Sequence, residues 1–306
     1  YGIGIDCHSK FYQLYLMYEK VFGSKIYNKY ELTFDAIPSE IEDAYKKVYE
    51  LLYENCEDFQ NNAQPLHYTL ESTGPYHRPL ILIWGGDPCI VNPLLATPSR
   101  RKTDKLDAKL LCNYDITGLF QRSYIPDEKL QEIKQLFSEY RRCKKLTTMY
   151  SNRILNLITY FGNTIGTFGK VTSAGIRPYI EDMCNGINAY HQGILKQPPG
   201  SICCQILNCY TEYDKYKEKS NEIQKLIENK IMNMEYNSLK GKISGKELLM
   251  YLTSIPGVGI FTAMTFISEI CDPTRFEHQK QVVAYCGFDP TLKISAGKVV
   301  SAKMRR

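Results

Sequence analysis

Four carboxylic acids occur at positions that suit a divalent-metal site for phosphodiester chemistry. Asp6 ends the apolar run that starts at Gly2, and Glu71 ends a second, β-prone run over 68–71. Asp104 and Asp107 are three residues apart in a predicted helix, so they share one face of it. Paired divalent ions, which prefer oxygen ligands, stabilise both the attacking and the leaving oxygen of a phosphoryl displacement. A single Asp at a strand end is more often a turn residue, so the prediction depends on all four acids together.

The elements that must position these acids lie within residues 1–118. Segments 3–17 and 25–34 are rich in Ile, Tyr and Leu and predict an opening meander of strands. Apolar residues at helical spacing predict a helix over 39–57, and further helices are expected over 75–84 and 103–114. Short strands are expected over 66–70 and 88–91. Strands followed by alternating β and α segments predict an α/β domain, with helices packed on a mixed sheet.

Residues 119–245 have a different pattern. Apolar residues recur every three or four positions over 130–161 and again over 206–234, with charged residues between them. Two long amphipathic helices predict an antiparallel coiled-coil arm, and a plain helical bundle fits the spacing equally well. Residues 246–306 are expected to form a small all-α domain that resembles a helix-turn-helix unit.

Composition adds weaker constraints. The 306 residues include 38 basic and 33 acidic side chains, so the formal charge of +5 decides little, but the basic residues cluster near 100–102, 141–145 and 303–306. Such clusters suit a polyanion or an ordinary solvated helix face. The 11 cysteines show no zinc-ligand spacing, which indicates a reduced, cytoplasmic protein. The longest apolar runs are too short or too interrupted to cross a membrane.

Three other motifs have both a functional and a plain interpretation. The Gly2-x-Gly4 pair lacks the third glycine of a dinucleotide fingerprint and precedes the strand end, so we reject that function. The turn that contains Gly257 and Gly259 presents free amides that suit a phosphate, although such turns also join helices without a ligand. His8 and His77 lie near the acids in sequence, where either could touch a phosphate, and we interpret them as solvated turn histidines.

Together these residues resemble a known family. The segments Gly4-Ile-Asp-Cys-His-Ser-Lys10, Glu71-Ser-Thr-Gly-Pro-Tyr76, Asn92-Pro93 and Lys102-Thr-Asp-Lys-Leu-Asp-Ala-Lys109 look like the N-terminal domain of the DEDD transposases of the IS110 group, relatives of the Piv invertases. The C-terminal segments 255–259, 272–276 and 284–290, with the loop around Ser295, resemble the transposase domain of the same group.

The resemblance implies a RuvC-like, ribonuclease-H-type fold for residues 1–118, a helical arm over 119–245 and a C-terminal transposase domain over 246–306. It implies that Asp6, Glu71, Asp104 and Asp107 bind Mg²⁺ and that Ser295 attacks DNA to form a covalent link. It also implies a guide RNA that bridges donor and target DNA, and a homo-oligomer assembled through the arm. Expected nucleic-acid contacts are Arg100, Arg101, Lys102, Gly257, Gly259 and Lys298.

Two departures from the family pattern are present. The family has glycine directly after the serine, whereas Ala296 stands between Ser295 and Gly297 here. The sequence stops at Arg306, before a basic segment that the family carries, so we expect a fragment or a decayed copy. The rival interpretations are a metal-only nuclease such as a junction resolvase, an inactive nucleic-acid-binding remnant, and a coiled-coil interaction protein.

Overall fold

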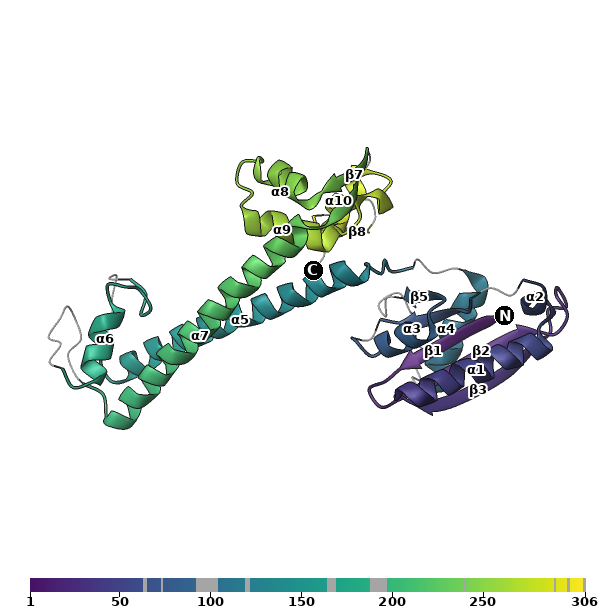
Figure 1. The fold of residues 1–306 in the computed structure, drawn as a ribbon, viewed down its shortest axis with the longest axis horizontal. Helices are drawn as coiled ribbons and strands as arrows, with labels where there is room; N and C mark the ends of the chain where they lie inside the picture. Colours follow the sequence, from purple (N-terminus) through teal and green to yellow (C-terminus); the bar gives the residue numbers. More distant parts are fainter. Residues whose placement is uncertain are drawn as a thin grey trace. The chain divides into compact units, whose positions relative to one another are not determined.

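A computed structural model describes residues 1–62, 65–72, 74–91, 104–118, 122–163, 169–187, 197–238, 240–288, 290–295 and 298–304, the last two ranges by their backbone. Its contacts divide the chain into two compact units, Tyr1–Ile125 and Pro126–Arg306 (Figure 1).

The first unit is built on a five-stranded mixed sheet. Its strands are β1 (Gly2–Cys7), β2 (Phe11–Glu19), β3 (Tyr27–Asp35), β4 (His67–Glu71) and β5 (Asp87–Val91), in the spatial order β3-β2-β1-β4-β5. The first three form an antiparallel meander, while β4 is parallel to β1 and β5 is parallel to β4. The predicted α/β architecture with a mixed sheet is therefore confirmed.

Helices cover both faces of this sheet. The main core joins alternate strand residues such as Ile5 and Leu70 to α1 (Pro38–Asn55), α2 (Glu57–Asn61) and α3 (Arg78–Trp84). On the opposite face, α4 (Asp104–Thr117) packs Ala108 and Cys112 against Tyr15 and Met17 of β2. Residue 103, where this helix was expected to start, lies outside the described residues. Side chains alternate between the two faces of a strand, so every second residue of β1 faces α4.

The second unit contains the two predicted long helices, α5 (Glu128–Tyr160) and α7 (Gly200–Met232), which lie side by side (Figure 1). They are antiparallel, because Ile133 near the start of α5 shares a core with Ile227 near the end of α7. At the other end, Ile154 and Ile206 share a second core with the short helix α6 (Arg177–Cys184). Isoleucines at helical spacing thus supply both cores, as the sequence pattern predicts.

The C-terminal part of this unit is mainly helical, as expected, but it also contains two hairpins that the expected all-α domain did not include. Helices α8 (Gly245–Thr253) and α9 (Ile260–Ile270) pack on the first of these two cores, and α10 (Gln279–Tyr285) follows a short 3₁₀ turn, η2 (Pro273–Arg275). Two hairpins accompany the helices: β6 (Glu235–Ser238) with β7 (Gly241–Ser244), and β8 (Pro290–Ser295) with β9 (Lys298–Met304). A reciprocal capping box between Ser244 and Glu247 fixes the start of α8 directly after β7.

Within the described part of the chain, no helix combines the length and the apolar character needed to cross a bilayer.

Candidate active site

Two of the predicted acids lie at the carboxyl ends of adjacent parallel strands. In the register between β1 and β4, Gly4 pairs with Thr69 and Ile5 pairs with Leu70. The next step aligns Asp6, near the end of β1, with Glu71, the last residue of β4. Parallel strands end at the same edge of the sheet, and aligned residues face the same side of it. Asp6 and Glu71 are therefore neighbours on the side that α4 covers.

The other two acids reach this edge because α4 lies very close to β1. A Cβ atom at Gly4 would lie under 3.0 Å from the carbonyl oxygen of Ala108 and the amide nitrogen of Cys112. Only glycine allows the helix backbone to approach so closely. Gly2 and Gly4 thus serve helix packing, which gives a physical reason for a motif that is not a nucleotide fingerprint. The first turn of α4, with Asp104 and Asp107, is brought towards Asp6 by this contact.

Asp115 fixes the far end of α4 on the same two strands. Its carboxylate accepts hydrogen bonds from the Ile3 amide (2.9 Å) and the Thr69 hydroxyl (2.8 Å), and it contacts Nδ1 of His67 at 2.9 Å. The position of the helix along β1 and β4 is therefore set at one end by polar contacts and in the middle by the glycines. Asp115 was not among the residues predicted from the sequence. The sequence feature that could have indicated Asp115 is its position eight residues after Asp107, which keeps both residues near the same face of the helix.

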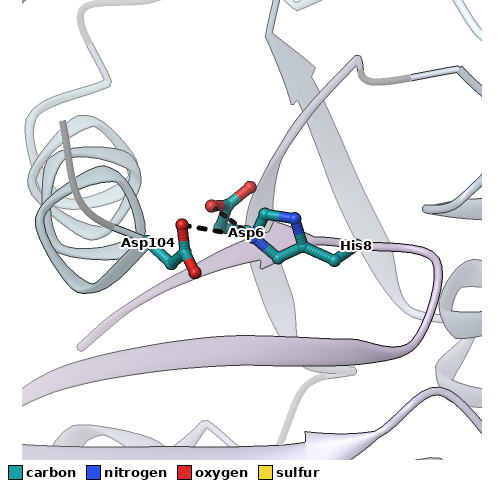
Figure 2. A group of neighbouring side chains, drawn as sticks. All are labelled: Asp6, His8 and Asp104. Atoms are coloured by element: carbon teal, nitrogen blue, oxygen red, sulfur yellow. Dashed lines mark hydrogen bonds and ion pairs between the residues drawn. The ribbon is translucent and has the colours of Figure 1, made fainter.

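His8 lies among the acids. Its Nε2 atom is 3.1 Å from Oδ2 of Asp6 and 3.6 Å from Oδ1 of Asp104. Dashed lines mark both contacts in Figure 2. One ligand atom from each of the three residues lies within 4.8 Å of the other two, which is a span suited to a metal ion. The interpretation of His8 as a solvated turn residue is therefore incomplete. The residue does follow β1 in a turn, and its side chain is 36 % exposed, but its ring faces the carboxylates.

The charge state of Asp6 reflects its surroundings. Asp6 is only 5 % exposed, and burial raises the pKa of its carboxyl group from 3.8 to about 6. The positive form of His8 opposes this rise, while the negative charges of Glu71, Asp107 and Asp104 add to the increase in pKa. All four predicted acids are therefore close enough to interact electrostatically. Such an anionic cluster is unfavourable by itself and becomes favourable when a cation neutralises it.

The residues at this edge suit a divalent cation. Four carboxylates offer the hard oxygen ligands that Mg²⁺ and related ions take, and the least exposed of them, Asp6, is held rigidly on the central strand. Such a donor set can support metal-assisted phosphoryl transfer.

The remaining predicted site residues belong to other segments. Ser295 is the last residue of β8 and pairs with Lys298, the first residue of β9, so both lie at strand ends in a hairpin. Gly257 has a φ angle of +86°, and Gly259 precedes the first turn of α9. The predicted basic contacts Arg100, Arg101 and Lys102 lie outside the described residues.

Comparison with known families agrees with this geometry. Residues 3–161, which form more than half of the chain, match the model of the DEDD transposases of the IS110 group. Residues 249–306 match a second model, described as the transposase IS116/IS110/IS902 family. No curated protein matches the chain significantly. The two matches confirm the resemblance found in the sequence. The chain therefore belongs to the IS110 family of DEDD transposases.

Proposed function

We propose that this transposase is a metal-dependent DNA recombinase of an insertion sequence. Membership of the family establishes a transposase that acts on DNA at a general level. The observation that supports metal dependence is the convergence of Asp6, Glu71, Asp104 and Asp107 at one edge of the sheet. Two Mg²⁺ ions are the proposed cofactors, because four carboxylates supply more ligands than a single ion commonly takes from protein.

In this proposal the carboxylates hold the ions, which when bound polarise the scissile phosphate. Asp6 is the anchor of the set, since it is the most buried of the four and lies on the central strand. Glu71 extends the ligand set along the sheet edge, and α4 contributes Asp104 and Asp107 from one helix face. The rigid attachment of these side chains to a sheet and a packed helix keeps the ligand geometry fixed during a reaction.

Ser295 is the proposed nucleophile. Its hydroxyl oxygen would form a bond to the scissile phosphorus as the bond from phosphorus to the DNA 3′ oxygen breaks, and the proton that the serine hydroxyl loses would be taken up by the departing 3′ oxygen. The phosphoserine link conserves the energy of the broken ester, so a free DNA end can later displace the serine without ATP. Lys298 pairs with Ser295 in the backbone register of the hairpin, and we propose that it contacts the nucleic acid.

Nucleic-acid contacts are proposed for the turn before α9 and for the basic segment 100–102. The N-terminus of α9 has no side-chain cap, so the amides of its first turn, after Gly259, are available to a phosphate, whereas the Val258 amide after Gly257 already donates to the Ile255 carbonyl. We further propose that a guide RNA joins donor and target DNA, and that the α5–α7 arm assembles protomers as a coiled coil. The proposed domains are 1–118, 119–245 and 246–306.

The test uses the full chain, Mg²⁺, a plasmid that carries the DNA flanking the coding sequence, and a transcript of that flanking DNA. Strand cleavage is measured on a native gel, and covalent protein–DNA adducts are measured after denaturation. We expect Asp6→Asn to abolish cleavage and Ser295→Ala to abolish adducts, whereas Ser301→Ala, on the paired strand of the same hairpin, retains both. Cleavage that survives Asp6→Asn would refute metal dependence. If the wild type cleaves DNA without forming any adduct, and Ser295→Ala leaves the cleavage unchanged, the protein is a metal-only nuclease.

A further inference from the structure

The imidazole of His8 is placed beside two carboxylates by contacts that do not involve them. The backbone amide of His8 donates to the carbonyl of Phe11 (3.0 Å), which forms the turn between β1 and β2. The ring also packs on the ring of Phe11, with centroids 4.7 Å apart and an interplanar angle of 32°. The direction of the ring is therefore fixed by the turn, and its Nε2 atom remains directed at Asp6 and Asp104 (Figure 2).

The distances match those between neighbouring ligands of one ion. Ligands that bind at roughly 2.1 Å and at right angles to each other are about 3 Å apart. The separations of Nε2 from the two carboxylate oxygens are 3.1 and 3.6 Å. An ion near these atoms would therefore bind all three side chains with only small side-chain rotations.

A second histidine in the same domain shows what a purely structural pair looks like. Nδ1 of His67 contacts Asp115 at 2.9 Å, and the two pairs have almost the same exposure, 37 % for His67 and 36 % for His8. The carboxylate of Asp115 also accepts bonds from the Ile3 amide and the Thr69 hydroxyl, so its charge is already stabilised by donors. The pair of His8 and Asp6 is surrounded instead by further negative charges. Hydrogen-bond donors thus balance the charge of Asp115 beside His67, whereas a cation is needed to balance the charges around Asp6 beside His8.

We propose that His8 provides an imidazole nitrogen ligand to the ion held by Asp6 and Asp104, and thereby raises the affinity of this position for first-row transition ions relative to Mg²⁺. First-row transition ions accept imidazole, whereas Mg²⁺ takes oxygen ligands almost exclusively. This inference rests on the proposed metal site and adds a residue that determines which metal the site prefers.

The experiment uses the full chain with Mn²⁺ as the probe, because its electron spin echo signal reports directly on nitrogen ligands. Mn²⁺ and Mg²⁺ affinities are measured for the wild type by titration and competition. The variant is His8→Gln, which replaces the imidazole nitrogen with an amide of similar reach whose oxygen can still bind Mg²⁺. The matched control is His67→Gln, which removes an equally exposed imidazole beside an equally buried carboxylate.

We expect a nitrogen modulation in the Mn²⁺ signal of the wild type and of His67→Gln, and its loss in His8→Gln. The ratio of Mn²⁺ to Mg²⁺ affinity should fall at least about 10-fold in His8→Gln, because mutation of residues around a metal site typically lowers metal affinity by this factor or more. The ratio should stay constant in His67→Gln. Binding of Mn²⁺ without nitrogen modulation, or an unchanged ratio in His8→Gln, would overturn the role of His8 and leave the carboxylate site intact. Failure of the wild type to bind either ion would overturn both this inference and the proposed metal dependence.

Discussion

Asp6→Asn should stabilise the metal-free first unit while removing its response to metal. The carboxyl pKa is 3.8 in an unfolded chain and about 6 in the folded one, so the native state binds the proton more tightly. Stability then falls as pH rises through this window, and above pH 6 the ionised carboxylate destabilises the fold by about 3 kcal/mol. Asn has the same shape without the charge, so the variant should gain up to about 3 kcal/mol at pH 7.

The chain provides a selective probe for this measurement. Trp84 is the single tryptophan of the sequence, is 5 % exposed, and lies on α3 in the same unit as Asp6. Its fluorescence during urea unfolding therefore reports the free energy of unfolding of the first unit even when the second unit unfolds separately. The measurement is made at pH 7 with a chelator and repeated with Mg²⁺.

The control is Asp43→Asn, because Asp43 is an exposed acid on α1 and its replacement should change stability by less than about 0.5 kcal/mol. Added Mg²⁺ should stabilise the wild type and the control but not Asp6→Asn, since a ligand stabilises only the state that binds it. A chelated Asp6→Asn protein that is equally stable or less stable than the wild type at pH 7 would refute the argument that the ionised carboxylate is held at a free-energy cost.

Three further predictions follow from the same site. Mg²⁺ affinity, measured by titration calorimetry, should decrease as pH falls through about 6, because the proton and the ion compete for the Asp6 carboxylate; a flat profile would contradict this competition. Gly4→Ala should destabilise the first unit by roughly 2 kcal/mol or more and weaken Mg²⁺ binding, because the new methyl group meets the α4 backbone at Ala108. The loss of stability is measured by Trp84 fluorescence during urea unfolding. A variant as stable as the wild type would show that α4 can move away from β1 at no cost. Asp115→Ala should reduce the free energy of unfolding by about 2–4 kcal/mol, because it leaves the Ile3 amide and the Thr69 hydroxyl without their acceptor; a loss below about 0.5 kcal/mol would show that water replaces the carboxylate.

Most elements of the first unit, the two long helices and the identity of the acids could be predicted from the sequence, whereas the two hairpins of the second unit were not predicted. An apolar run that ends in Asp6 is a buried strand with a polar end, and the interval of three residues between Asp104 and Asp107 places both on one helix face. These properties are local, because alternation and helical periodicity depend on neighbouring residues only. The family motifs added the order of the two regions, which the family matches confirm.

The way in which these elements meet depends on contacts between residues far apart in the sequence. The register of β1 against β4 aligns Asp6 with Glu71. The close approach of α4 to β1 requires glycine at position 4, which no local sequence pattern predicts. The direction of the His8 ring depends on Phe11 across a turn, and the anchoring role of Asp115 depends on donors more than forty residues away in sequence. Contacts of this kind arise from strand register and helix packing, which sequence periodicity does not encode because it constrains each element separately.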